Sequence, residues 1–413
     1  MKKFFLSFLT FMLLLCSLPY QVVLADELEL PAQSAIAVEA DTGKILYEKD
    51  SEKKRDVGGL STLLTTYLIF EAIHEKKLSL KDPIKLSEKA LALNDIEGAG
   101  TLPMEANQYT VEQLLTALLV GNSSTAALAL AEKVGGSEKS FVEKMKQKLS
   151  EWGIQSPHLI NATGLNTQTI SGDPDGKGDE NQLSAYDIAV IAKHLLQDFP
   201  EVTKYTSKPT ALFSNTQIEN PNLMLEGMPN YRSGVDGLRV SNSTKGGITF
   251  AASTTQNGIH MITVVLGVEA VDGDPYARFV ATSSLMNYVV RTFVSSIVVK
   301  EGDPYGKSKA TIMDGKSETV LAVAKKDFYI VEKQGSQAEP KIQFKSDQES
   351  FRAPVKSGTN LGKIHYTDPD KIGRGYLEDQ EPTVDMVAGR TIEKSFFLKV
   401  WWNEFVRYVN EKL

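Results

Sequence analysis

Cysteine is nearly absent from this sequence, because Cys16 is the only one among 413 residues. It lies within an apolar run, residues 4–18, that follows two lysines. A basic start, a short apolar core and the aliphatic or small residues Val23 and Ala25 before the expected cleavage point are typical of a secretory signal peptide. We therefore predict that residues 1–25 are removed on export, and that the mature chain has no disulfide, thiol nucleophile or thiolate metal site.

The alternative for this N-terminal run is an uncleaved membrane anchor. Its apolar core is shorter than the roughly 20 residues that a spanning helix needs, which favours cleavage. Lipidation at Cys16 is excluded because Leu15, the residue before it, is not small. Removal of 25 residues from 413 leaves 388, which is enough for two domains.

Histidine is scarce, and positive charge is in deficit. The five histidines are scattered, and none has the spacing of a metal site (His74, His158, His194, His260 and His365). The net charge is −7, and loss of the two signal-peptide lysines moves it to −9. An acidic chain without a basic stripe is a poor nucleic-acid binder. We predict no metal, no cofactor and no nucleic-acid partner.

From about residue 32 to residue 290 the pattern alternates between strands and helices. Alternating runs at 34–38 and 45–47 flank a turn at 41–44 and predict a hairpin. Asn257 and Gly258 predict a second hairpin. Helices are expected at 60–77, 110–134, 184–196 and 277–293, and strands at 250–253 and 260–268. Strands at both ends with helices between them indicate a mixed α/β layer.

Two of these helices have clear start signals. Thr110 is followed three residues later by Gln113, the pattern of a capping box. Ser184 is the expected N-cap of the helix at 184–196. Gly135 and Gly136 mark the end of the helix expected at 110–134.

After about residue 295 the pattern changes. Short alternating runs are separated by clusters of glycine, proline, aspartate and serine; the runs lie at 319–323, 328–331 and 341–344. This texture predicts a small all-β domain.

The C-terminal residues 391–413 form a different pattern again. At 100° per residue, acidic residues (Glu393, Glu404 and Glu411) fall on one helical face, and apolar residues fall opposite (Leu398, Trp401, Trp402, Phe405 and Val409). Such a helix suits the membrane interface, with tryptophan at headgroup depth. The alternative is a helix whose apolar face packs on the β domain of the same chain.

Several segments then point to one family. They are LLTTYL at 63–68, ALAE at 129–132, NATGL at 161–165, SAYD at 184–187, RSGVDGL at 232–238 and ITVVLG at 262–267. In content and order they closely resemble serine-type D-alanyl-D-alanine carboxypeptidases, the low-molecular-mass penicillin-binding proteins.

The resemblance implies a signal peptide at 1–25, then a mixed α/β domain of the β-lactamase or penicillin-binding transpeptidase type at 26–294. A small all-β domain at 295–390 and an amphipathic membrane-anchoring helix at 391–413 follow. It also implies export to the outer face of the cytoplasmic membrane or the cell wall.

The family resemblance implies three catalytic motifs, and the first is S-x-x-K at the start of a buried helix. Its serine is acylated, and its lysine, one turn later, is the base. Anchoring on LLTTYL places the serine position at Gly59 and the lysine position at Thr62. Glycine has no side chain to acylate, and threonine cannot take a proton as a neutral amine can.

The second and third motifs are altered as well. S-x-N, anchored on ALAE, falls at Asn122 and Ser124, so serine and asparagine have in effect exchanged places. K-T-G, anchored on RSGVDGL, falls at Arg239, Val240 and Ser241. Arg239 keeps a cation that pairs with carboxylates. The motif's hydroxyl position is now Val240, and its glycine is now Ser241.

A displaced nucleophile is the remaining catalytic possibility. Ser61 is two residues beyond Gly59, which on a helix turns it about 200° away, and Leu64 stands where its lysine would be. The literal S-x-x-K at 51–54 lies in a charged stretch before the helix, without apolar residues at helical spacing, so we interpret it as a chance match. The Thr-Lys-Gly at 244–246 would be off the register of the third motif, so a surface turn is the better interpretation.

Three hypotheses follow. The first is a catalytically inactive family member that binds peptidoglycan stem peptides or a cell-wall synthesis protein, since residues of such a constellation fail as a unit. The second is a working serine carboxypeptidase that removes the terminal D-Ala from pentapeptide with a displaced nucleophile. The third is a structural surface module. Covalent penicillin labelling separates the second from the others, and titration of a stem peptide separates the first from the third.

Overall fold

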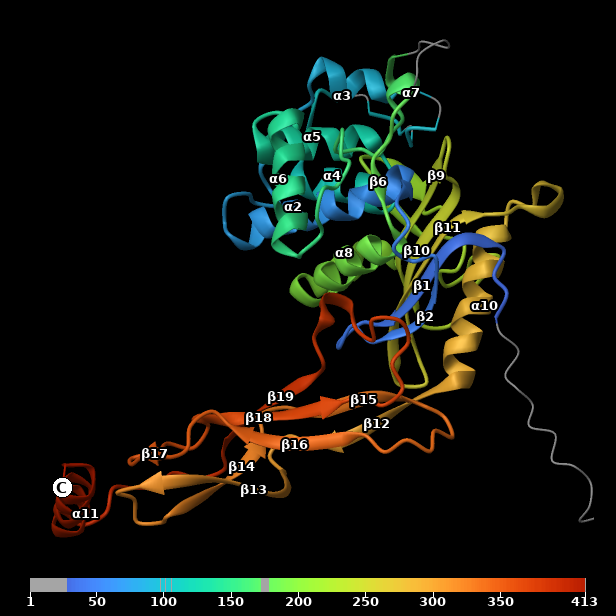
Figure 1. Cartoon of the computed structure of the whole chain (residues 1–413). Coiled ribbons are helices and arrows are strands. Elements are labelled where there is room, and N and C mark those ends of the chain that lie inside the picture. The colour runs from blue at the N-terminus through green and yellow to red at the C-terminus, as the bar shows by residue number, and fades with distance from the viewer. Residues whose placement is uncertain (1–27, 97, 101, 105, 172–177, 413) are drawn as a thin grey trace, which may run out of the picture.

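The computed structural model describes residues 28–96, 98–100, 102–104, 106–171 and 178–412. The expected signal peptide, with Cys16, lies outside these residues. An antiparallel five-stranded sheet forms the centre of the first part of the chain, in the order β2-β1-β11-β10-β9 (Figure 1). Its strands are β1 (Ala32–Glu39), β2 (Ile45–Lys49), β9 (Val235–Ser243), β10 (Gly247–Gln256) and β11 (Ile259–Val268).

Both predicted hairpins are confirmed. β1 pairs with β2 across the turn at 41–44, and β10 pairs with β11 across Asn257 and Gly258. Those two turn residues have φ of 50° and 74°, the left-handed conformation that asparagine and glycine adopt most easily. The mixed α/β architecture is therefore as the sequence predicted.

Helices cover both faces of the sheet, so its central strands are buried on both sides. On β1, Ile36 and Val38 face the core beneath α8, whereas Ala35 and Ala37 face the core beneath α10. Alternate residues thus serve two separate cores, which is why these strands are apolar without interruption. The covering helices are α8 (Ala185–Asp198) and α10 (Ala277–Thr292), on opposite sides of the sheet in Figure 1.

The other elements of this part complete a helical layer and its small β pairs. The helices are η1 (Gly58–Ser61), α2 (Thr62–His74), α3 (Glu88–Leu93), α4 (Val111–Leu119), α5 (Ser124–Gly135), α6 (Glu138–Glu151), α7 (Thr167–Ser171), η2 (Pro200–Val202), α9 (Thr203–Thr206) and η3 (Val271–Gly273). The strands are β3 (Arg55–Asp56), β4 (Pro83–Lys85), β5 (Gln108–Thr110), β6 (Gln182–Leu183), β7 (Thr210–Phe213) and β8 (Thr216–Glu219).

The prediction of one continuous helix at 110–134 was wrong. Its capping box is present, with Thr110 and Gln113 bonded reciprocally, but α4 ends at Leu119 and α5 begins at Ser124. Between them Asn122 has φ of 57°, a left-handed conformation that a helix does not contain. The break matters because it carries the second motif position into a loop.

The chain from β12 onward forms the expected all-β part. Its strands are β12 (Phe293–Val299), β13 (Pro304–Met313), β14 (Thr319–Ala324), β15 (Phe328–Lys333), β16 (Lys341–Ser346), β17 (Phe351–Arg352), β18 (Asn360–Thr367) and β19 (Thr383–Ala388), with η4 (Leu377–Asp379) between the last two. A six-stranded sheet and the β12-β15 pair enclose a core of their own. The domain boundary at 294/295 stays a prediction.

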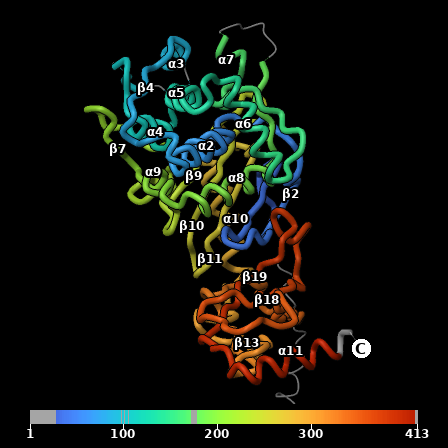
Figure 2. The backbone as a smooth tube through the Cα atoms, turned by 90° about the vertical axis from the view of Figure 1, so that its left-hand side faces the viewer, coloured from blue at the N-terminus to red at the C-terminus, as the bar shows by residue number. Residues whose placement is uncertain are grey.

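The C-terminal helix α11 (Phe397–Lys412) lies at the far end of the β part, as Figure 2 shows. The helix begins later than residue 391, because Ile392 pairs as an extended residue with Val355. The alternative of a helix with its apolar face packed on the β domain does not hold, since Trp401, Trp402 and Phe405 are exposed. Among the described residues, no helix has both the length and the apolar content to cross a bilayer.

The loop between β18 and β19 ties the two parts together, and in Figure 1 it rises from the β part to α8. At its base Lys44 pairs with Asp368 at 2.7 Å, with side chains only 2% and 1% exposed. At its tip Glu378 accepts hydrogen bonds from Lys193 and His194 of α8, at 2.8 and 2.9 Å. These contacts fix one part against the other.

We expect Lys44→Met to destabilise the fold by about 3–5 kcal/mol, because it leaves the Asp368 carboxylate buried without a cation. Calorimetric unfolding of the mature chain would measure this. Lys325→Met is the matched control, since its ion pair with Asp385 is exposed and worth about 0–1 kcal/mol. Equal effects of the two substitutions would contradict the expectation.

Candidate functional site

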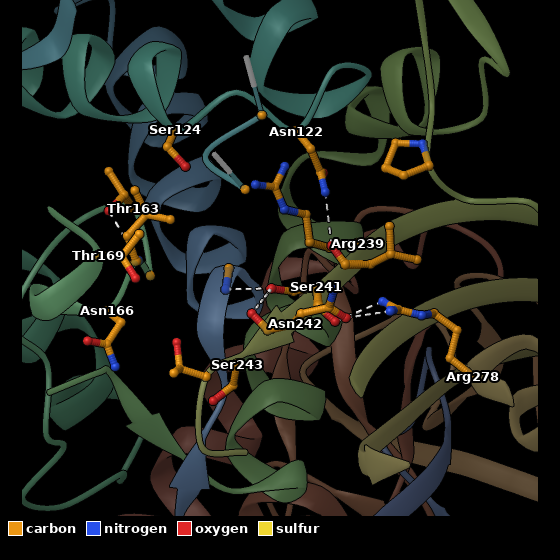
Figure 3. A pocket seen from close by; sticks show the side chains of 18 of the residues that line it. Asn122, Ser124, Thr163, Asn166, Thr169, Arg239, Ser241, Asn242, Ser243 and Arg278 are labelled. Atoms are coloured by element: carbon orange, nitrogen blue, oxygen red, sulfur yellow. Dashed lines mark hydrogen bonds between the residues drawn. The ribbon is translucent and has the colours of Figure 1, made fainter. Parts of the chain in front are cut away.

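A cleft of about 840 Å³ lies along β9, the edge strand of the central sheet. Its walls include four segments that are distant in sequence: η1, the turn between α4 and α5, residues 163–166, and the end of β9. Figure 3 shows these side chains converging on the open space. One wall requires glycine, because a Cβ at Gly164 would lie 2.2 Å from the carbonyl oxygen of Gly58.

The cleft brings together most of the motif positions inferred from the sequence. Its lining includes Gly59, Asn122 and Ser124, together with the third-motif residues Arg239, Val240 and Ser241. Thr62 is buried and outside the lining, and its hydroxyl donates to the Gly59 carbonyl at 2.6 Å. Hence the short Thr62 side chain does not line the cleft.

Gly59 supplies no nucleophile, and its amide is already bonded. The Gly59 N–H donates to the Ser241 hydroxyl at 2.7 Å. That hydroxyl donates in turn to the Asn242 carbonyl at 3.3 Å. A Cβ at position 59 would stand 3.0 Å from the Ser241 Oγ and 3.7 Å from a guanidinium nitrogen of Arg239. The first motif position is therefore in direct contact with the third.

Asn122 links the second motif position to the third. Its left-handed backbone closes the turn between α4 and α5, and its side-chain amide donates to the Val240 carbonyl at 3.0 Å (Figure 3). Ser124 is the first residue of α5, and Ser123 is its N-cap, accepting from the Ala126 amide. Asn122 thus has a structural partner on β9, while the backbone amide of Ser124 donates to the Ala99 carbonyl at 2.9 Å.

Arg239 is the main charge in the depth of the cleft, and only 5% of it is exposed. One guanidinium nitrogen donates to the Leu118 carbonyl at 2.6 Å, while the Nε has no partner among the described residues. No ion pair to Arg239 occurs within that part of the chain, and burial lowers the pKa of its guanidinium to about 9. A buried cation without a counter-ion fits an anionic ligand, most directly a carboxylate.

Two further charged residues of the cleft were missed in the sequence. Arg278 of α10 donates to the carbonyls of Ser241 and Thr249, at 2.8 and 3.1 Å, and burial lowers its pKa to about 10. Glu180 accepts from Asn166 and from the Thr244 amide, while its other oxygen is buried without a partner among the described residues. No spacing signal marked either of them, because only the tertiary fold brings them to β9.

The two serines considered as displaced nucleophiles, Ser61 and Ser51, do not line the cleft. Ser61 is fully buried outside the cleft lining, donates to the Gly58 carbonyl and accepts from Asn181. Ser51 donates to the Glu48 carboxylate and is not among the residues that line the cleft. The 244–246 segment is the β9–β10 turn, as predicted.

A serine, a histidine and an aspartate also lie close together at the other end of the sheet from the β9–β10 turn. Ser253 Oγ is 3.1 Å from the His260 ring, and His260 is 4.0 Å from Asp41. Ser253 is 0% exposed, so no substrate reaches its hydroxyl. No group of three or more potential ligands for a metal ion occurs in the described part of the chain.

Comparison with known proteins gives consistent matches. The family model for D-alanyl-D-alanine carboxypeptidase matches residues 21–270, and the model for the penicillin-binding protein 5 C-terminal domain matches residues 293–394. The D-alanyl-D-alanine carboxypeptidase DacF of Bacillus subtilis is 26% identical, over 82% of each chain. DacA of Escherichia coli is 24% identical, over 90% of this chain and 86% of that one.

A solved structure is more similar still. The peptidoglycan synthesis regulatory factor PBP3 of Streptococcus pneumoniae is 44% identical, with a TM-score of 0.85, over 89% of this chain and 100% of that one. Penicillin-binding protein 5 of Haemophilus influenzae is 23% identical with a TM-score of 0.68, a likeness of fold.

Proposed function

This chain belongs to the D-alanyl-D-alanine carboxypeptidase family of penicillin-binding proteins, and from that premise we propose that it serves peptidoglycan metabolism by binding rather than by acyl transfer. Its ligand in the cleft is the carboxylate end of a peptidoglycan stem peptide. The main observation behind the proposal is the glycine at position 59, because a residue without a side chain cannot form an acyl-enzyme.

Two observations support binding in the cleft over a purely structural role. The cleft remains open, at about 840 Å³. Arg239 lies there without a carboxylate partner among the described residues. Burial of an unpaired cation destabilises the fold, and an anionic ligand that pairs with Arg239 would offset this cost. A purely structural role does not account for an unpaired cation in the cleft.

The proposal includes attachment to the outer face of the cytoplasmic membrane through α11. The exposed aromatic residues of this helix and of the residue before it support the attachment: Phe396, Phe397, Trp401, Trp402 and Tyr408 are each at least 59% exposed. Such a concentration of aromatic surface is typical of a helix at a membrane interface. Binding of a cell-wall synthesis protein by the same surfaces is the second candidate for the partner.

If the protein does not carry out acyl transfer, fluorescent penicillin should not label the purified mature protein covalently. Denaturing gel electrophoresis would measure this, with the carboxypeptidase DacF of Bacillus subtilis as the labelled control. A stable band on the unmodified protein would overturn the proposal, and peptide mapping would then identify the nucleophile.

Calorimetric titration with a pentapeptide that ends in D-Ala-D-Ala tests the binding role directly. We expect saturable binding, and a loss of about tenfold or more when the terminal carboxylate is amidated, since a charge-assisted hydrogen bond is worth about 1.5–3 kcal/mol. Equal affinity for both peptides would show that the terminal carboxylate is not recognised. Absence of binding by either would favour the structural module or a protein partner.

A further inference from the structure

The residues at the three altered motif positions bond to one another across the cleft. Ser241 accepts the amide of Gly59 at 2.7 Å, and Asn122 donates to the carbonyl of Val240 at 3.0 Å. Figure 3 shows Asn122 pointing toward β9, beside Arg239 and Ser241. We propose that Ser241 is the specificity-determining residue of this cleft, because its hydroxyl closes the amide of residue 59 to the carbonyl group of a ligand. This inference rests on the proposed binding function.

The amide at position 59 matters for a general chemical reason. Serine acyl transfer needs backbone N–H groups, commonly including that of the nucleophile itself, directed at the oxygen of the reacting carbonyl. Here that N–H points at Ser241 Oγ instead. A β-lactam or a scissile peptide carbonyl would have to displace a hydroxyl that belongs to the protein. A carboxylate held by Arg239 would not have to do so.

The space at position 59 depends on Ser241 as well. A Cβ on residue 59 would lie 3.0 Å from the Ser241 Oγ but 3.6 Å from its Cβ. The first contact is too tight without movement, and the second is ordinary van der Waals contact. The Ser241 hydroxyl would therefore have to move by a few tenths of an ångström to admit a side chain at residue 59, and it already occupies the amide of that residue.

Asn122 adds to the closure of the strand edge. β9 is the outermost strand of its sheet, and an edge strand is where a bound peptide can add as a further strand. The Asn122 side-chain amide already donates to the Val240 carbonyl of this strand. A ligand of this cleft thus binds by its end, at Arg239, and does not extend the sheet past Val240.

The test compares four proteins in fluorescent penicillin labelling: the unmodified chain, the double variant Gly59→Ser/Thr62→Lys, and that double variant with Ser241→Ala or with Ser241→Thr. The double variant restores nucleophile and base but keeps the blocking hydroxyl. Ser241→Ala removes the hydroxyl, whereas Ser241→Thr retains it as the matched control. We expect labelling with Ser241→Ala to be at least about 100-fold faster than with the other two, the usual effect of one oxyanion donor.

If the unmodified chain stays unlabelled but the double variant and its Ser241→Ala derivative label at equal rates, this inference is overturned. Labelling of the unmodified chain would instead overturn the proposed function. A second measurement decides the matter if no variant is labelled. Amide hydrogen exchange of Gly59, followed by NMR, should become about fivefold faster in the single variant Ser241→Ala, as loss of a hydrogen bond worth about 1 kcal/mol requires. An unchanged exchange rate would overturn the inference.

Discussion

Replacing Arg239 with methionine should weaken the binding of a carboxylate-ended stem peptide by about 100-fold or more without lowering the melting temperature. Removal of one partner from a buried, hydrogen-bonded charge pair costs about 2–5 kcal/mol. In the free protein the same guanidinium is buried without a counter-ion among the described residues. An apolar side chain of similar volume removes that burial cost, and water in the open cleft can replace the donor that the Leu118 carbonyl loses.

Titration calorimetry and thermal unfolding of the same samples would measure the two effects together. Arg239→Lys is the control, because it keeps the charge and should retain part of the affinity. A methionine variant that binds the peptide normally would contradict the expectation, and one that melts much earlier would show that Arg239 is a structural residue.

The pH dependence provides a further check on the same residue. Burial lowers the pKa of Arg239 to about 9, below its value in the unfolded chain. The cation therefore destabilises the fold below pH 9, and this effect is relieved as the pH rises above 9. Affinity for a carboxylate has the opposite trend, since it needs the charged form. We expect binding to be full below pH 9 and to fall as the pH rises through it.

Replacing Trp401, Trp402 and Phe405 with serine should reduce partition of the protein into lipid vesicles by about a thousandfold. These side chains are 62%, 59% and 47% exposed. Full burial of an apolar side chain gives about 1.5–3 kcal/mol, so three partly buried rings supply about 4 kcal/mol in all. Vesicle sedimentation with anionic phospholipids would measure the partition.

The matched control is the triple variant Leu212→Ser/Val271→Ser/Tyr329→Ser. These apolar residues are exposed by 73%, 73% and 52%, but they lie outside α11. We expect them to leave partition unchanged. If both triple variants lost binding equally, general surface hydrophobicity and not the helix would account for membrane association.

The sequence predicted most of the elements, because their signals are local. Asn257 and Gly258 determine a turn through their own backbone freedom, and Thr110 caps α4 through a residue three positions away. The break at Asn122 was missed because apolar residues at helical spacing continue on both sides of it. Nothing in that spacing shows that the intervening turn is needed as a wall of the cleft.

The candidate site was predicted only in part. Its positions at 59, 122, 124 and 239–241 came from the family resemblance, and the structure places all of them in one cleft. The contacts between them were not foreseeable. Whether Ser241 reaches the amide of Gly59 depends on how closely β9 approaches η1, a distance that only the packed fold determines. Arg278 was missed for the same reason.

The attachment of α11 has a consequence for where the protein can act. Asp314, whose side chain is fully buried, pairs with Arg407 of the helix and with Arg352, and Ser395 just before the helix donates to the Asp314 carbonyl. The β18–β19 loop then holds the β part against α8. From helix to cleft the chain is therefore a series of bonded parts and not a tether. With α11 on the membrane, as proposed, a molecule built in this way would hold its cleft at one fixed height above the lipid. Only stem peptides in that layer would then come within its reach.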